Sequence, residues 1–183
     1  MSDKTKANRG LLFERHISLM CMTYQGERRA VIYKVPTSFL PLRGKDGKVV
    51  SCKVDHKSCV DYLGHFSGVP VALEAKSVKR DYIRYDAVQD HQSDFLDDWA
   101  ACGGIAAVLV AFDDDVFCVP WAYWKTGREA WIRYQCGEAA PERVTVCGCE
   151  TTGKASLRPG DLLPEWRVEE MDFLKVLRTF PRT

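Results

Sequence analysis

The sequence has no long hydrophobic run and no apolar segment at its start. No stretch of about 18 apolar residues occurs in the 183 residues, so a membrane-spanning helix is not expected. Residues 1–9 are polar, unlike a secretory signal. No internal repeat is present either. We therefore expect a cytoplasmic protein whose residues 1–183 form a single domain, because a chain of this length supports one well-buried core.

Cysteines at zinc-binding spacing are also lacking, although the chain has eight cysteines. There is no Cys-x-x-Cys motif, and no histidine follows the last cysteines. Several of the cysteines fall in apolar runs, so we expect small buried side chains in a reducing compartment. A zinc site formed by Cys136, Cys147 and Cys149 is the alternative, and it would indicate a zinc or redox protein.

Positive charge is missing from one long segment. Residues 85–115 hold eight Asp and no Lys or Arg, whereas residues 26–84 hold twelve Lys or Arg against six Asp or Glu. This separation can present a basic face to phosphates and an acidic face elsewhere. A solvated helix face followed by a turn would also explain the acidic block. The acidic triplet at residues 113–115 favours a plain turn over a metal site, because adjacent turn residues diverge.

The most informative stretch is residues 61–76. Its second half, residues 69–76, has the alternating pattern of a β-strand, so Glu74 and Lys76 share one face. Gly64 and Gly68 would let the chain double back, and the resulting hairpin would bring Asp61 beside Glu74. Two adjacent carboxylates repel unless a cation lies between them. Oxygen ligands of this kind suit Mg²⁺ or Mn²⁺.

An acid followed by acid-x-lysine on an adjacent strand is similar to the arrangement in the PD-(D/E)xK nucleases. A lysine such as Lys76 can steady the charge that develops on a phosphorane, or help to deprotonate an attacking water. The alternative is a solvated strand edge, since Glu-x-Lys also occurs by chance. The glycine-bracketed turn and the second acid, Asp61, favour the catalytic interpretation.

Residues 39–57 form the most basic segment. The Asp46-Gly47 pair is typical of a hairpin turn, and the flanking residues supply little that would fill a core. We therefore expect a projecting β-hairpin; a flexible surface loop with incidental lysines is the alternative. The basic side chains of this segment are Arg43, Lys45, Lys48, Lys53 and Lys57.

The remaining elements are predicted from periodicity and from capping signals. In chain order they are a helix after an N-cap at Asn8, a strand at 30–35, a helix at 87–101 closed by Gly103-Gly104, a buried strand at 105–112, a strand at 116–119 and a short helix at 121–124.

Several short motifs, in their order along the chain, resemble the RecU-type Holliday junction resolvases. They are Asn8-Arg9-Gly10 with Glu14, residues 30–34 with Pro36-Thr37, Asp61-Tyr62-x-Gly64, Glu74-Ala75-Lys76, His91-Gln92, Gly103-Gly104-Ile105 and Asp172-Phe173-Leu174. The resemblance spans most of the chain.

The resemblance implies an α/β, restriction-endonuclease-like fold: a mixed β-sheet flanked by helices, with the basic hairpin as a stalk that enters the junction centre. It also implies a homodimer that makes paired nicks in four-way junction DNA with Mg²⁺ or Mn²⁺. The implied catalytic residues are Asp61, Glu74, Lys76, Glu14 and Gln92. Gln92 would position water or phosphate, and a solvated helix glutamine is the alternative. The implied metal ligands are Asp61, Glu74 and the Ala75 carbonyl, and Glu14 could support a second metal. Candidate DNA-backbone contacts outside the hairpin are Arg9, Lys79, Arg80 and Arg84.

The chain departs from the family pattern in three places. Cys59-Val60 stands where the family usually has a threonine before the catalytic Asp, the stalk is short, and residues 131–150 resemble an insertion. These departures concern junction preference more than the metal site. A less selective repair nuclease of the same fold and a junction-binding accessory without catalysis are the alternative functions.

Overall fold

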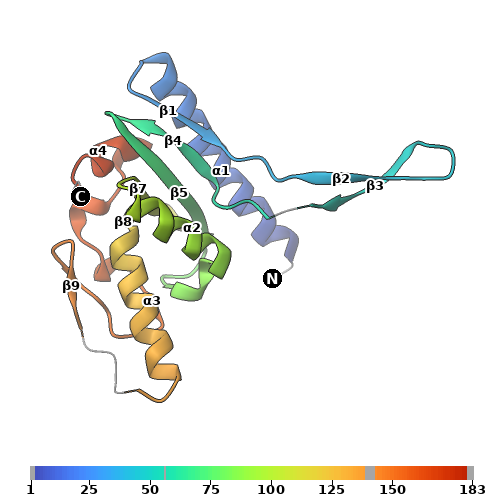
Figure 1. Cartoon of the computed structure of the whole chain (residues 1–183). Helices are drawn as coiled ribbons and strands as arrows, with labels where there is room; N and C mark the ends of the chain where they lie inside the picture. The colour runs from blue at the N-terminus through green and yellow to red at the C-terminus, as the bar shows by residue number, and fades with distance from the viewer. Residues whose placement is uncertain (1–2, 56, 139–142, 181–183) are drawn as a thin grey trace.

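The computed structural model describes residues 3–55, 57–138 and 143–180, and Figure 1 shows their arrangement. A five-stranded sheet with the order β1-β4-β5-β7-β8 forms its centre. β5 and β7 pair in parallel, and the other neighbours are antiparallel, so the sheet is mixed. The five strands are β1 (Ala30–Lys34), β4 (Tyr62–Phe66), β5 (Val69–Val78), β7 (Ile105–Phe112) and β8 (Asp115–Pro120).

Helices cover both faces of this sheet. α1 (Asp3–Gly26) packs on β1 and β5, and α4 (Phe173–Leu177) lies on the same face, where its Phe173 ring meets Tyr24 of α1 edge to face. α2 (Asp90–Ala101) and α3 (Trp121–Gln135) pack on the other face against β7 (Figure 1). No helix among these residues is long and apolar enough to cross a membrane.

Short elements complete the fold. Three two-stranded pairs are β2 (Phe39–Arg43) with β3 (Val49–Val54), β6 (Ile83–Arg84) with β11 (Ser156–Leu157), and β9 (Thr145–Val146) with β10 (Cys149–Glu150). Four 3₁₀ turns are Tyr85–Ala87, Pro159–Asp161, Pro164–Trp166 and Glu169–Met171.

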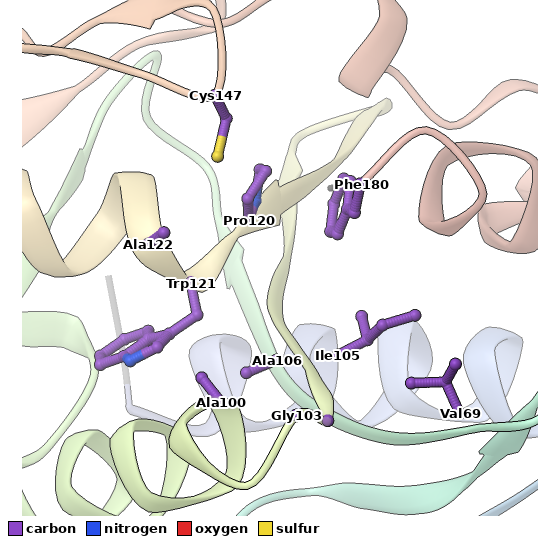
Figure 2. Close-up of a pocket in the computed structure, with 11 residues that line it drawn as sticks. Val69, Ala100, Gly103, Ile105, Ala106, Pro120, Trp121, Ala122, Cys147 and Phe180 are labelled. Carbon is purple, nitrogen blue, oxygen red and sulfur yellow. The ribbon is translucent and has the colours of Figure 1, made fainter. Parts of the chain in front are cut away.

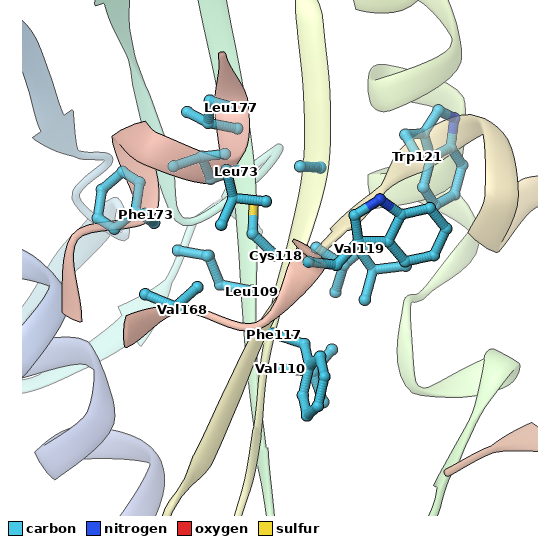
Figure 3. Close-up of a cluster of buried hydrophobic side chains, with 14 of the residues drawn as sticks. Leu73, Leu109, Val110, Phe117, Cys118, Val119, Trp121, Val168, Phe173 and Leu177 are labelled. Carbon is cyan, nitrogen blue, oxygen red and sulfur yellow. The ribbon is translucent and has the colours of Figure 1, made fainter. Parts of the chain in front are cut away.

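The core is centred on β7, whose eight residues are all buried, as expected for a strand covered on both faces. Figure 3 shows Phe173 and Leu177 of α4 over Leu73, Leu109 and Cys118 of the sheet. β5 pairs with this buried strand from Val71 to Val78, which fixes the position of Glu74 and Lys76 beside the core.

The predicted fold class is confirmed, as are the strands near residues 30–35, 69–76 and 105–112 and the projecting hairpin. β2 and β3 extend away from the body of the protein (Figure 1), and every residue in these two strands is solvent-exposed. Two Gly residues close α2 as predicted: Gly103 has φ +83, and the N–H of Gly104 donates to the Trp99 carbonyl at 3.0 Å.

Three predicted boundaries were wrong. α1 begins at Asp3, so Asn8 lies within the helix rather than capping it, because residues 3–7 contain no Pro or Gly that would break a helix. α2 begins at Asp90, because Val88 is extended (φ −85, ψ 117) after a separate 3₁₀ turn. α3 continues to Gln135 instead of ending at residue 124.

Two glycines act through close packing rather than through a turn. Gly64 was expected to help the chain double back, but it lies inside β4, where a Cβ would stand 2.2 Å from the Val31 carbonyl oxygen. Gly127 continues α3, where a Cβ would stand 2.4 Å from the Tyr85 ring. Both positions need the missing side chain so that a neighbouring element can approach.

Candidate active site

The β4–β5 hairpin brings two acids together. It turns through Ser67 and Gly68, which have φ values of +50 and +84, the left-handed pair that a tight two-residue hairpin requires. Tyr62 pairs with Leu73 across the hairpin, so the preceding residue, Asp61, lies opposite Glu74. Asp61 Oδ2 accepts a hydrogen bond from the Ala75 N–H at 2.9 Å, which fixes the first carboxylate against the second strand.

Glu74 is the most deeply buried acid of this cluster, with a side chain only 1% exposed. Its Oε1 forms a salt bridge with Lys76 Nζ at 2.7 Å and accepts a hydrogen bond from Gln92 Nε2 at 2.6 Å. Its Oε2 is buried and has no hydrogen-bond partner among the described residues. A buried oxygen without a partner is costly in a folded protein, and a bound cation would satisfy it.

The protonation of Glu74 reflects this environment. Burial raises its pKa to about 7, the Lys76 ammonium opposes that rise, and the neighbouring Asp61 carboxylate adds to it. The carboxyl is therefore poised near neutral pH, and a divalent cation between the two acids would favour the charged form.

Gln92 connects α2 to the acid and the lysine. It is the third residue of α2, and its Oε1 accepts from the backbone N–H of Gln89 at 3.0 Å and from Lys76 Nζ at 3.3 Å. With two donors on its oxygen, the amide presents its NH₂ group to Glu74. The structure thus brings four of the predicted residues into one cluster: Asp61, Glu74, Lys76 and Gln92.

Glu14 lies elsewhere. Its Oε2 is paired with Lys34 Nζ at 2.5 Å, and its backbone carbonyl accepts a hydrogen bond from Tyr62 Oη at 2.6 Å. Lys34 and Tyr62 are cross-strand partners, and Tyr62 reaches α1, so they occupy the α1 side of the sheet. Glu74 contacts α2 on the opposite face, and no contact of Glu14 with Asp61 or Glu74 is found among the described residues.

No zinc-type cluster forms in the part of the chain that the structure describes. No group of three or more His, Cys, Asp or Glu side chains there could hold a metal ion. Cys136 is exposed at the end of α3, while Cys147 and Cys149 belong to the β9–β10 hairpin. A metal ion held by Asp61 and Glu74 would need further ligands, which the Ala75 carbonyl, solvent or substrate oxygens could supply.

Six of the predicted DNA-binding residues fall in two places. Arg43, Lys45, Lys48 and Lys53 are exposed on the β2–β3 hairpin. Lys79 and Arg80 are exposed just beyond the end of β5, close along the chain to Lys76, and Arg80 Nη1 donates to Tyr82 Oη at 2.6 Å.

Three further basic residues are placed differently. Arg9 is half-buried on α1, and Arg84 is engaged by Asp86 at 2.6 Å. Lys57 was expected on the hairpin, but β3 ends at Val54, and Lys57 Nζ instead donates to Gln89 Oε1 at 3.1 Å. Lys57 therefore lies at the base of the hairpin, against the start of α2.

An apolar cavity of about 300 Å³ lies at the start of β7 (Figure 2). Its lining includes Val69, Gly103, Ile105, Pro120, Trp121 and Phe180. None of its lining residues is charged, so it offers no chemistry for phosphate hydrolysis. The acid pair, rather than this cavity, is the candidate site.

A mixed sheet with two acids and a lysine at its centre defines the restriction-endonuclease-like class of α/β proteins. The family model described as "RecU: Recombination protein U" matches residues 8–138 of the chain. The protein therefore belongs to the RecU family. The match covers every residue of the acid, lysine and glutamine cluster.

Individual relatives agree with this assignment. A Holliday junction resolvase RecU from Streptococcus pneumoniae (strain Hungary19A-6) is 32% identical over 116 residues, which are 60% of this chain and 58% of that protein. A Holliday junction resolvase RecU from Streptococcus oralis is 31% identical over the same lengths. The chain thus spans about 58% of the length of the curated relatives it matches.

A solved structure with partial similarity is that of Archaeoglobus fulgidus Hjc, a Holliday junction resolvase from an archaeal hyperthermophile. The two chains share 15% sequence identity with a TM-score of 0.40, over 62% of this chain and 73% of that one.

Proposed function

We propose that the protein is a Holliday junction resolvase, a metal-dependent, structure-selective endodeoxyribonuclease that nicks four-way DNA junctions symmetrically. The observation that carries the proposal is that Glu74 Oε2 is buried without a hydrogen-bond partner among the described residues, while Asp61 lies opposite Glu74 across the hairpin and Lys76 binds the other oxygen of the same carboxylate. Membership of the RecU family and the resolvase relatives support it. We place its activity in the cytoplasm.

The residues present fit a divalent cation. Asp61, Glu74 and the Ala75 carbonyl are the oxygen donors that would hold Mg²⁺ or Mn²⁺, and the free Oε2 is the atom whose burial such an ion would offset. When bound, the metal would polarise the scissile phosphate and lower the pKa of the attacking water. Glu14, paired with Lys34, is not part of this ligand set.

The neighbouring side chains supply the remaining chemistry. Lys76 Nζ is held by Glu74 Oε1 and Gln92 Oε1, so the ammonium has a fixed position beside the proposed metal ligands. From there it can orient the nucleophilic water, or stabilise the negative charge that develops on the phosphorane. Gln92 keeps Glu74 and Lys76 in that arrangement by contacting both.

The basic side chains would bind the DNA backbone. Lys79 and Arg80 directly follow β5. The exposed β2–β3 hairpin, which extends away from the body (Figure 1), bears further basic side chains. Contacts of this kind give affinity without reading sequence, as binding to any four-way junction requires. We propose that the hairpin enters the junction centre while the strand β5 approaches one arm.

Symmetric cleavage needs two active sites. A junction has two-fold symmetry, and a homodimer with a two-fold axis would present its two acid pairs to equivalent strands. We therefore propose a homodimer as the active form, with four-way junction DNA as its partner.

The proposal is tested by incubating a labelled four-way junction with the protein and Mg²⁺ or Mn²⁺, beside a linear duplex with the same arm sequences. Paired, symmetric nicks on the junction alone are expected. Equal cutting of both substrates would indicate the less selective repair nuclease. Tight binding without cutting by either metal would contradict the catalytic role and favour a junction-binding accessory.

A further inference from the structure

The position of Lys57 is not accounted for by a contribution to the positive charge of the β2–β3 hairpin. It follows β3 and precedes Asp61 by four residues, so it lies on the segment that joins the hairpin to the first catalytic acid. Its ammonium donates to the side-chain oxygen of Gln89 at 3.1 Å. The segment after it is braced by a hydrogen bond from Ser58 Oγ to the Val60 carbonyl at 2.5 Å.

Gln89 is the N-cap of α2, and its backbone N–H donates to Gln92 Oε1 at 3.0 Å. That hydrogen bond helps to decide which end of the Gln92 amide faces Glu74. If the amide were reversed, its oxygen would face the Glu74 carboxylate and its NH₂ group would face the Lys76 ammonium. Both contacts would be repulsive, so the present orientation depends on donors at Gln92 Oε1.

The first turn of α2 is held from two sides. Lys57 contacts Gln89, and Arg128 of α3 pairs with the exposed carboxylate of Asp90. The Lys57 contact acts on the residue that donates to Gln92, whereas the Arg128 contact acts on the following residue. Lys57 is thus connected to the acid and lysine by the side chain of Gln89, the N–H of Gln89 and the amide of Gln92.

We propose that Lys57 is a positioning residue for the cleavage reaction, acting through Gln89 on the amide of Gln92 that holds Glu74 and Lys76. This inference rests on the proposed nuclease function, and it assigns Lys57 a role different from the phosphate contacts of the hairpin lysines. Because Lys57 belongs to the segment between the hairpin and Asp61, it also links the placement of the hairpin to the order of the active site.

The test compares Lys57→Met, Gln89→Met and the double variant in single-turnover cleavage of a four-way junction, with affinity measured separately in Ca²⁺. Each single variant is expected to lower the cleavage rate at saturating protein about tenfold while changing affinity less than twofold. The double variant should be no slower than the slower single variant, because both break one connection. Lys57→Arg should recover most of the rate.

Two matched lysines define the comparison. Lys53→Met removes a cation from the hairpin and is expected to weaken DNA binding. Lys175→Met removes an exposed lysine that pairs with Glu170 on the α1 side of the sheet, and it should change neither quantity. The inference is overturned if Lys57→Met weakens binding as Lys53→Met does while the saturated rate stays intact, or if Gln89→Met keeps the full rate.

A second measurement does not depend on cleavage. The ¹⁵N-labelled side-chain amide of Gln92 should shift in the NMR spectrum of both the Lys57→Met and the Gln89→Met protein. Unchanged Gln92 amide signals would overturn the inference even if the wild-type protein cut no DNA. A shifted signal together with an inactive wild-type protein would instead retain the connection and reject the nuclease function.

Discussion

Gln92 Nε2 and Glu74 Oε1 lie 2.6 Å apart, joined by a hydrogen bond that is buried between α2 and the centre of the sheet. This contact uses one oxygen of the carboxylate, and the other is buried without a hydrogen-bond donor from the described residues. The Gln92 amide therefore occupies Oε1 of Glu74, whereas Oε2 remains available to a cation.

Replacing Gln92 by Met should remove the hydrogen bond to Glu74 Oε1 while keeping the volume of the side chain. We expect single-turnover cleavage of a four-way junction to slow by about 10- to 100-fold, because Glu74 and Lys76 lose a shared partner. Stability should fall by about 1–2 kcal/mol, since Gln92 also accepts a hydrogen bond at the start of α2. Urea denaturation measures the second effect. Full activity in this variant would show that the amide has no role in the site.

The pKa of Glu74 predicts how stability depends on pH in the absence of divalent metal. Burial raises this pKa from about 4.5 to about 7, so between these values the folded protein binds a proton that the unfolded chain releases. The folded state is then favoured at low pH and loses that advantage as pH rises from about 4.5 through about 7. The total change is on the order of 3 kcal/mol.

Glu74→Gln tests this sign directly. We expect the difference in unfolding free energy, variant minus wild type, to grow as pH rises through 7, because the variant has no carboxyl to ionise. Urea denaturation in EDTA at several pH values measures it. A difference that shrinks with rising pH would mean that the carboxylate is stabilised in the fold rather than destabilised. The same variant should lose cleavage while still binding the junction.

Gly64 should be the more sensitive of the two glycines around the β4–β5 hairpin. A Cβ at this position would stand 2.2 Å from the Val31 carbonyl oxygen and 2.5 Å from Ile32 Cα, so β1 would have to move away from β4. We expect Gly64→Ala to destabilise the protein by about 3 kcal/mol. Gly68→Ala is the control: it has open space but φ +84, so about 1 kcal/mol is expected. Equal effects of the two changes would contradict the register of β1.

The hairpin lysines should contribute to affinity through phosphates. Lys45 and Lys48 are exposed near the turn, and Lys48 Nζ lies 3.8 Å from Asp46 Oδ2 in an exposed, weak ion pair that DNA phosphates can replace. Replacing both by Met should reduce the magnitude of the slope of log affinity against log salt concentration by about 1–2, because fewer phosphate contacts form and fewer counterions are released on binding. Junction binding measured across a salt series provides the slope. An unchanged slope would place the DNA away from the hairpin.

Much of the fold and the centre of the site could be predicted from local sequence. The alternation of residues 69–76 and the Gly68 turn were enough to place Asp61 beside Glu74, because strand geometry and hairpin register are short-range properties. The position of Glu14 could not be derived in this way. It depends on Lys34 and Tyr62, two cross-strand partners that meet α1 only when the sheet has formed.

Lys57 shows the same limit in a different form. From sequence it belongs with the hairpin lysines, because they share one basic segment. In the folded chain it contacts Gln89, which is 32 residues further along and carries no motif of its own. Helix boundaries were also missed where a 3₁₀ turn precedes a helix, or where helix-compatible residues extend it beyond the expected N-cap, since periodicity does not distinguish these cases.

Titration of Mn²⁺ into the metal-free protein, followed by calorimetry and electron paramagnetic resonance, would show whether Asp61 and Glu74 form a divalent metal site. We expect saturable binding that is lost in both Asp61→Asn and Glu74→Gln and retained in Glu14→Gln, because Glu14 is paired with Lys34. Binding that survives both changes in the acid pair, or disappears only with Glu14→Gln, would contradict it.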